Sequence, residues 1–261
     1  MPRISVLYVT HRPGGFDILK HDLRRQRFQD FELVVVDDWD QEREAAVREY
    51  LDEFDLTYLE PRPPRQTDYW NLNKAYNDGI EACDGDLIVS LQDYIWIDEN
   101  ALERFWDVYE QTGDFVTGVG GKYGQPAEIA DPNDPISVFE TEYMDPPTEQ
   151  VEPDPRIDGQ QGVVETEFWR WEADWGAFPR DGAYALGGFD EEMDRIFSGD
   201  NVGFAYRASK LGYRFYTDKR NEFRGFDHGQ WFPRPEDRLD HHFKDTDWLQ
   251  RYEREFVFDY L

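Results

Sequence analysis

The stretch Ile4-Ser-Val-Leu-Tyr-Val-Thr10, followed by His11-Arg-Pro-Gly-Gly15, decides the fold class of this 261-residue chain. Its first seven residues are mostly apolar and β-branched, as in a strand that is buried on both faces. The periodic segment 16–28 then predicts a helix. A second apolar run, residues 31–36, ends in two acidic residues. Strand, loop, helix and strand in this order predict an α/β domain with a parallel sheet.

The same alternation continues along the first half of the chain. The expected elements are helices over residues 41–54, 70–82 and 100–111 and strands over residues 56–59 and 86–91. In open parallel sheets, ligands bind outside the carboxyl ends of the strands. The polar residues that follow the first two strands, Thr10 to Arg12 and Asp37-Asp38, are therefore candidates for a ligand site.

A second informative stretch runs from Gly187-Gly-Phe-Asp190 through Asp200 to Arg207. Paired glycines allow a sharp turn because they adopt backbone angles that other residues resist. The apolar positions after Asp200 recur at helical spacing and predict a helix over residues 201–211. A carboxylate at the start of that helix meets the positive end of the helix dipole and stays ionised. Asp200 is therefore either a catalytic base or only a helix cap.

The composition is strongly acidic, with 57 acidic against 28 basic residues and a net charge of -29. Such a charge disfavours nucleic acid and anionic membranes as partners, because their phosphates are repelled. An aromatic fraction of 16% favours a packed core over the disorder that is common in acidic chains. In molar salt the Debye length falls to about 3 Å, so dense surface acid no longer repels itself. The composition predicts a halophilic protein of a high-salt cytoplasm, with an acidic mesophilic protein as the alternative.

Other features narrow the class of protein further. No apolar run approaches the length of a membrane span, and the start Met1-Pro-Arg-Ile-Ser-Val is typical of a strand rather than of a signal peptide. We therefore expect a soluble, cytoplasmic protein. The single cysteine, Cys83, excludes an internal disulfide and is expected to be a packed small residue.

Three features together resemble a glycosyltransferase of the GT-A fold, of the inverting family-2 type. They are the opening strand with Thr10-His11-Arg12, the strand that ends in Asp37-Asp38, and the segment from Gly187 to Asp190 that leads to Asp200. The resemblance implies a Rossmann-like, mostly parallel sheet flanked by helices. It also implies an enzyme that moves a hexosyl group from a nucleotide-sugar donor to an acceptor hydroxyl with inversion.

The resemblance also implies a domain organisation. We expect a GT-A domain over residues 1–234, with a nucleotide-binding half (1–119) and an acceptor and catalytic half (163–234). Between them, the proline- and acid-rich segment 120–162 is expected to form a flexible loop on the acceptor side, or a surface insertion without a role. The tail 235–261 is expected to form an amphipathic helix or two, or a partner-binding face.

The donor site is implied at the strand ends and in the third helix, where Lys74, Asn77 and Gly79 are similar to the family's pattern. A UDP-sugar is the commonest donor in the family, and guanosine and thymidine diphosphates are the alternatives. The implied donor-binding residues are Thr10, His11, Arg12, Asp38, Lys74 and Asp93.

In the family, an Asp-x-Asp element after the fourth strand holds manganese or magnesium on the donor diphosphate, because hard oxygen ligands suit a hard cation. Here the strand ends in Gln92-Asp93-Tyr94, so Asp93 is the one carboxylate, and Tyr94 falls where an aspartate is often found. His228 is implied as a further metal ligand. Without a metal, arginine or lysine side chains would have to stabilise the leaving diphosphate.

An inverting transfer needs one carboxylate that takes the proton of the acceptor hydroxyl, and the resemblance implies Asp200 for this role. The acceptor is a glycan, a lipid-linked sugar or a protein. The implied acceptor-binding residues are Trp175, Asp190 and Glu191. A tryptophan stacks on sugars but is also ordinary core, and Trp169 and Trp171 share that ambiguity.

Two other functional classes are considered. A non-catalytic nucleotide- or glycan-binding protein on a decayed glycosyltransferase scaffold is favoured by the incomplete metal element and by Gly199, which stands where the family has an acidic neighbour of the base. A nucleotidyltransferase that makes nucleotide sugars should carry a longer phosphate loop with a lysine after the first strand. The segment from His11 to Gly15 is too short and contains no lysine, which disfavours that class.

Overall fold

The computed structural model describes residues 2–39, 42–60, 71–124, 134–137, 146, 148–152, 154, 156–196 and 200–226. The elements that the sequence predicts for the first half are confirmed, with ends that differ by a few residues. The strands are β1 (Ile4–Thr10), β2 (Phe31–Asp37), β3 (Leu56–Leu59) and β4 (Leu87–Gln92). The helices are α1 (Phe16–Arg25), α2 (Glu44–Tyr50), α3 (Leu72–Ala82) and α4 (Ala101–Thr112).

After β4 the chain adds strands that the sequence did not predict. They are β5 (Ile95–Ile97), β6 (Phe115–Tyr123), β7 (Gln150–Glu152), β8 (Val163–Thr166), β9 (Trp175–Pro179) and β10 (Phe215–Phe226). The helical segments are η1 (Phe168–Arg170), α5 (Arg180–Leu186), η2 (Glu191–Ile196) and α6 (Asn201–Lys210). The pairing of β10 with β6 shifts register between Thr217 and Glu222. This irregularity, filled with charged residues, hides the period of two on which a strand prediction depends.

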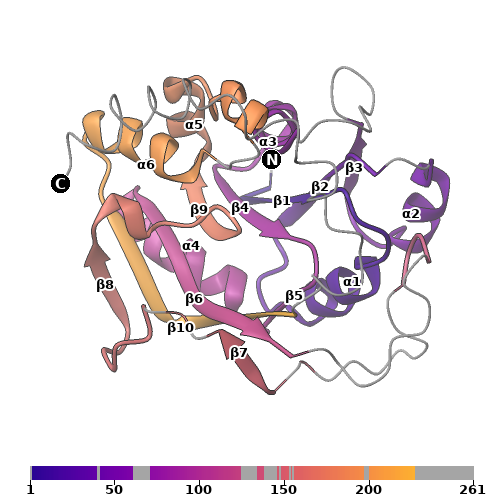
Figure 1. Cartoon of the computed structure of the whole chain (residues 1–261), viewed down its shortest axis with the longest axis horizontal. Coiled ribbons are helices and arrows are strands. Elements are labelled where there is room, and N and C mark those ends of the chain that lie inside the picture. The colour runs from indigo at the N-terminus through magenta and orange to yellow at the C-terminus, as the bar shows by residue number, and fades with distance from the viewer. Residues whose placement is uncertain are drawn as a thin grey trace.

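All strands join one sheet in the order β3-β2-β1-β4-β9-β6-β10-β5, with β7 added to β6 and β8 to β10 (Figure 1). β1, β2, β3 and β4 run parallel to one another, and β6 is parallel to β10. β9 runs antiparallel between β4 and β6, with Trp175 opposite Leu91. The start of β9 therefore lies at the same edge as the carboxyl ends of β1, β2 and β4.

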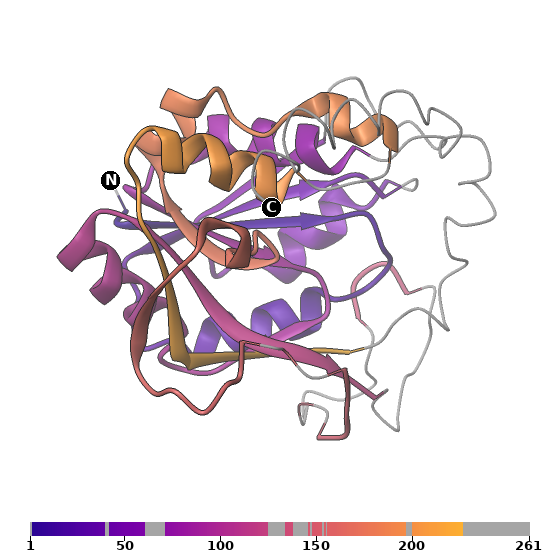
Figure 2. The ribbon, with the colours of Figure 1, turned by 60° about the vertical axis from the view of Figure 1, so that its left-hand side comes forward.

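Helices cover both faces of the sheet. The orange helices α5 and α6 lie on one side of the strands and the indigo helix α1 lies on the other (Figure 2). Side chains alternate along β1, so that Val6 and Tyr8 pack on the side of α1 and α4, whereas Leu7 and Val9 pack on the side of α3 and α6. Burial on both faces explains why the first strands read as continuous apolar runs. Within the described ranges, each helix is too short or too polar to traverse a lipid bilayer.

The segment 120–162 is only partly a loop. β6 continues to Tyr123, and β7 pairs with it. The described stretch 134–137 lies against the donor half of the domain, since the carbonyl oxygen of Ile136 accepts from the backbone N–H of Phe16 at 3.1 Å and that of Pro135 accepts from Arg43 Nη1 at 2.7 Å. This stretch contacts α1 and the loop after β2, in contrast to the expected acceptor-side position. Much of the rest of the segment and the tail 235–261 lie outside the described residues.

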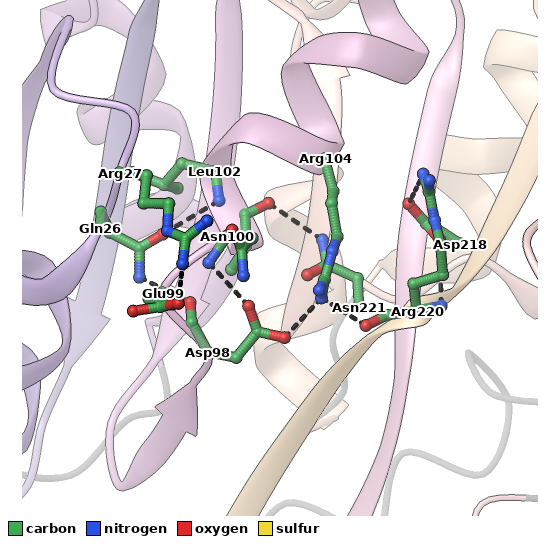
Figure 3. A network of polar contacts seen from close by, with 11 residues as sticks. Gln26, Arg27, Asp98, Glu99, Asn100, Leu102, Arg104, Asp218, Arg220 and Asn221 are labelled. Atoms are coloured by element: carbon green, nitrogen blue, oxygen red, sulfur yellow. Dashed lines mark hydrogen bonds and ion pairs between the residues drawn. The ribbon is translucent and has the colours of Figure 1, made fainter.

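A polar network fastens the start of α4 to the irregular part of β10 (Figure 3). Asp98 accepts the backbone N–H of Asn100 at 2.7 Å and pairs with Arg104. Arg104 also donates to the carbonyl oxygen of Arg220, and Asn221 Nδ2 donates to that of Ala101 at 3.1 Å. Arg104 thereby supplies a partner to the Arg220 carbonyl, which lies where the pairing of β10 with β6 is interrupted.

Candidate active site at the carboxyl edge of the sheet

The predicted donor residues of the first half meet where β1, β2 and β4 end. In the sheet register, Thr10 is paired with Asp37, and Val9 with Gln92. The first turn of α3 reaches the same edge, because Asn71 Nδ2 donates to Asp38 Oδ2 at 3.2 Å. Side chains that are separated along the chain therefore line one edge, as the topology of parallel strands requires.

Asp93 is held by two of the predicted donor residues. Its Oδ2 accepts from Thr10 Oγ1 at 2.9 Å, and its Oδ1 is 2.6 Å from Arg12 Nη1. The Asp93 side chain is 2% exposed and that of Arg12 is 19% exposed. The carboxylate is thus buried and neutralised, whereas part of the guanidinium reaches the surface, where it can meet an anion.

The two residues beside Asp93 are committed to the protein interior. Tyr94 has φ of 59°, and its hydroxyl donates to the carbonyl oxygen of Pro13. Burial raises the pKa of Tyr94 well above the ordinary tyrosine range. Gly15 leaves room for this ring, since a Cβ there would lie 3.2 Å from Tyr94 Cε1. On the other side, Gln92 Nε2 donates to Asp174 Oδ1 at 2.6 Å.

The described residues alone do not make up a site for a divalent cation. Both oxygens of Asp93 accept hydrogen bonds from Thr10 and Arg12. The Tyr94 hydroxyl donates to the carbonyl oxygen of Pro13 in the loop between β1 and α1. Across the residues that the structure describes, no group of three histidine, cysteine or acidic side chains could hold a metal ion. The predicted ligand His228 lies outside the described residues.

The two aspartates at the end of β2 have different environments. Asp37 is 0% exposed; it accepts from Arg43 Nε at 2.5 Å and Nη2 at 2.9 Å, and from the Tyr58 hydroxyl at 2.7 Å. The Arg43 guanidinium in turn lies 4.5 Å from the centre of the Trp39 ring. Asp38 is half-buried, and its backbone N–H donates to the carbonyl oxygen of Thr10 at 2.8 Å. Asp37 is therefore structural, and Asp38 lies at the rim, where a donor-binding role stays a prediction.

The other two donor predictions lie at the same edge. His11 directly follows β1 and is half-buried. Lys74 lies in the first turn of α3, where its backbone N–H donates to Asp194 Oδ2 at 3.2 Å. Their contact with a donor likewise stays a prediction.

Asp200 precedes α6 and is 1% exposed. Its side chain makes no capping bond to α6; Oδ2 instead accepts from Arg207 Nη1 at 2.9 Å and from the backbone N–H of Asp190 at 2.8 Å. Among the described residues, Oδ1 is buried without a hydrogen-bond partner. Burial raises the pKa of Asp200, and Arg207 opposes that shift. The helix-cap alternative is therefore wrong for this side chain, which has one engaged oxygen and one open oxygen.

The turn before η2 has the geometry that its glycines predict. Gly187 has φ of 74° and Gly188 has φ of 79°. Asn77 of α3 holds the turn through both backbone groups of Phe189, at 2.7 Å and 2.9 Å. Asp190 Oδ1 accepts from the backbone N–H of Glu192 at 3.0 Å, as the cap of η2.

Glu191 lies beside this turn and is exposed. Its Oε1 accepts from Asn77 Nδ2 at 3.0 Å. Through its bond to the Glu192 N–H, Asp190 also holds the turn. Contacts of Asp190 and Glu191 with an acceptor stay predictions.

Sequence reasoning missed Asn73 and Asp194. Asn73 Nδ2 donates to Asp194 Oδ1 at 2.8 Å, and its Oδ1 accepts from the backbone N–H of Asp200 at 2.8 Å. Asp194 also accepts from the backbone N–H groups of Asn73 and Lys74, so it caps α3. Burial raises the pKa of Asp194 to about 7. This cap comes from a residue 121 positions away along the chain, so no local spacing could have revealed it.

The tryptophans separate into core and surface. Trp175 is 0% exposed, and its ring lies 4.7 Å from that of Phe105. We therefore assign Trp175 to the core, which corrects the expected acceptor role. Trp171 is also buried, against Phe115, whereas Trp169 is 48% exposed. The pattern of aromatic residues could not distinguish them, because a buried indole and a sugar-stacking indole are the same residue in the sequence.

The family model described as Glycosyl transferase family 2 matches residues 19–155, which is more than half of the chain. The chain belongs to glycosyl transferase family 2. The matched range begins within α1 and ends before β8, so it includes Asp93 and not Asp200. A comparison with curated protein sequences finds no match.

Solved structures show the same fold. TarS of S. aureus, residues 1–349 in complex with UDP, has a TM-score of 0.60 at 14% identity, over 86% of this chain and 60% of that one. Its complex with UDP-GlcNAc has a TM-score of 0.61 at 14% identity, over 86% of this chain and 58% of that one. GalNAc-T7 with UDP, GalNAc and Mn²⁺ has a TM-score of 0.66 at 15% identity, over 97% and 48%. The chain has the GT-A fold and spans between 48% and 60% of the length of these structures.

Proposed function

We propose that this domain transfers a hexosyl group from a nucleotide-sugar donor, a UDP-sugar, to an acceptor hydroxyl with inversion. Membership of glycosyl transferase family 2 supports nucleotide-sugar transfer, and TarS and GalNAc-T7 are solved with UDP. The observation that carries the proposal is the pair of sites at one sheet edge. Arg12 on Asp93 offers a cation beside the proposed donor diphosphate, and Asp200 offers one carboxylate oxygen that has no hydrogen-bond partner among the described residues.

The donor is proposed to bind across the ends of β1, β2 and β4. Asp38 and His11 would contact the base or ribose, whereas Thr10, Asp93 and Lys74 would lie near the diphosphate and the sugar. The partly exposed Arg12 is the cation best placed to stabilise the leaving diphosphate. Since Asp93 holds Arg12 in place, little reorganisation is needed when negative charge develops.

Asp200 is proposed as the general base. Its Oδ1 takes the proton of the acceptor hydroxyl as that oxygen forms a bond to the anomeric carbon. The bond between this carbon and the diphosphate oxygen breaks on the opposite face, and the diphosphate leaves with the electron pair. The raised pKa of Asp200 makes it a stronger base than an exposed aspartate. Asp190 and Glu191 lie beside it and would contact a glycan, lipid-linked or protein acceptor.

A divalent metal on Asp93 and His228 was the expectation, and the GalNAc-T7 structure holds Mn²⁺. Thr10 and Arg12 engage both oxygens of Asp93, and His228 lies outside the described residues, so the described part of the chain does not by itself supply a metal site. The geometry favours Arg12 as the residue that stabilises the negative charge of the leaving diphosphate.

The test is calorimetric titration of UDP, GDP and dTDP in molar potassium chloride, with manganese and with chelator, combined with UDP release from UDP-GlcNAc. We expect UDP to bind, and Asp200→Asn to bind UDP as the wild type does while UDP release is lost. Binding that persists with chelator would support the role of Arg12. Absence of binding by any of the three nucleotides would refute the donor site. Repeating the titration at low salt tests the predicted halophilic setting.

The alternative is a non-catalytic nucleotide- or glycan-binding protein. The burial of Asp200 and its pairing with Arg207 favour this alternative, because both restrict access to a base. Tight binding of UDP without release of UDP from UDP-GlcNAc, with or without added acceptor glycans, would support it.

A further inference from the structure

We propose that Asn73 is a positioning residue for Asp200. Its side-chain amide ties the start of α6 to the first turn of α3 and so sets the direction in which Asp200 Oδ1 faces. The inference rests on the proposed function, in which Asp200 is the base. It assigns to α3 a role in proton transfer that is separate from the donor contact predicted for Lys74.

Asn73 is held from three directions. Its side chain is 0% exposed, its Nδ2 donates to Asp194 Oδ1 at 2.8 Å, and its Oδ1 accepts from the backbone N–H of Asp200 at 2.8 Å. Its own backbone N–H donates to the same carboxylate oxygen at 2.9 Å. Asp194 thereby fixes the orientation of the amide, with its oxygen toward Asp200.

The chemistry of the primary amide suits this position. A donor is needed toward the Asp194 carboxylate, and an acceptor is needed toward the Asp200 N–H. Asparagine supplies both within one short planar group. A leucine, which has the same branching, supplies neither and leaves a buried N–H without its partner, which is costly.

The hydrogen bond between the Asp200 backbone N–H and Asn73 matters because the Asp200 carboxylate is fixed at Oδ2. Asp200 Oδ2 accepts from Arg207 and from the backbone N–H of Asp190, so the side chain cannot rotate freely. Because Oδ2 is anchored and the backbone N–H is bound to Asn73, Oδ1 is held facing a single direction. If the contact with Asn73 is lost, the backbone of Asp200 can shift and carry Oδ1 away from the acceptor hydroxyl.

The decisive variant is Asn73→Leu. We expect kcat for UDP release from UDP-GlcNAc to fall about 10- to 100-fold, as misplacement of a reacting group by an ångström does. We expect the KM for UDP-GlcNAc to change little.

Asn221→Leu is the matched control. Asn221 is also a fully buried asparagine, and its Nδ2 donates to the carbonyl oxygen of Ala101 (Figure 3). It lies on β10 at the start of α4, on the other side of the sheet from α3. We expect a comparable loss of thermal stability with kcat unchanged. A fall in kcat for Asn73→Leu no larger than that for Asn221→Leu would overturn the proposal, as would a loss expressed in UDP affinity.

A measurement that does not depend on activity separates this inference from the proposed function. Exchange of the Asp200 backbone amide with deuterium reports directly on its bond to Asn73. We expect slow exchange in the wild type and in Asn221→Leu, and fast exchange in Asn73→Leu. Fast exchange in the wild type would refute the positioning contact. Slow exchange in a wild type that binds UDP and releases none from UDP-GlcNAc would refute the proposed function and leave the contact intact.

Discussion

Gly188→Ala tests whether the turn before η2 depends on the clamp from α3. Gly188 has φ of 79°, and a Cβ built there would lie 2.2 Å from Asn77 Oδ1. The same amide holds both backbone groups of Phe189. Gly187 offers a matched control, since its φ is 74° and no atom lies within 4 Å of its added Cβ.

The two glycines should therefore differ in a calculable way. At either position, a left-handed backbone costs an alanine about 1–2 kcal/mol. At Gly188 the new methyl group must also displace Asn77 and break its two hydrogen bonds to Phe189, at about 1 kcal/mol each. We expect Gly187→Ala to lower the free energy of unfolding by about 1–2 kcal/mol and Gly188→Ala by about 3–4 kcal/mol.

The assay is urea unfolding followed by tryptophan fluorescence, with thermal melting as the second probe. The difference of about 2 kcal/mol corresponds to a Tm lower by about 4–8 °C for Gly188→Ala than for Gly187→Ala in a chain of this size. A double-mutant cycle with Asn77→Ala should show a coupling energy of similar size, because removal of the amide also removes the clash. Equal destabilisation by the two glycine variants, or a coupling energy near zero, would refute the reasoning.

Two further predictions concern buried carboxylates. Asp37→Asn leaves the Arg43 charge buried without its partner and should lower the free energy of unfolding by about 3–5 kcal/mol in urea titrations. The exposed pair of Glu44 with Arg48 is the control. A loss for Asp37→Asn as small as that for Glu44→Gln would contradict this expectation. Asp194 has a pKa raised from 3.8 to about 7, so between these values the folded protein holds a proton that the unfolded chain releases, and stability falls as the pH rises through that window. Asp194→Asn should make this fall smaller when unfolding is measured from pH 4 to pH 8, and an unchanged slope would contradict the raised pKa.

The sequence predicted the elements of the first half because those signals are local. The apolar run Ile4–Thr10 and the strand Leu56–Leu59 are strands with the expected bounds. The turn at Gly187 and Gly188 was also predictable, since a positive φ selects for glycine at the position itself. The strand β10 was missed, because its register shift interrupts the alternation that identifies a strand.

The candidate site was predictable only as far as strand ends and helix starts could indicate it. Strand ends placed Thr10 and Arg12 at one edge, and the family resemblance implied Asp93 there; the structure brings the three into contact. The strand ends could not distinguish Asp37 from Asp38. Asp37 is the last residue of β2 and is enclosed by Arg43, whereas Asp38 follows the strand and lies at the rim, and this difference depends on the position of Arg43 in the fold.

The sequence by itself determined the fold class, the order of the first elements, the turn at the paired glycines and the family. Tertiary structure alone decided which polar residues act together. The bond between Asn73 and Asp200 joins residues 127 positions apart, and that between Arg12 and Asp93 joins residues 81 positions apart. Neither separation repeats along the chain, so neither leaves a period to detect. Such contacts exist only after the sheet has brought α3, α6 and the ends of the strands to a common edge.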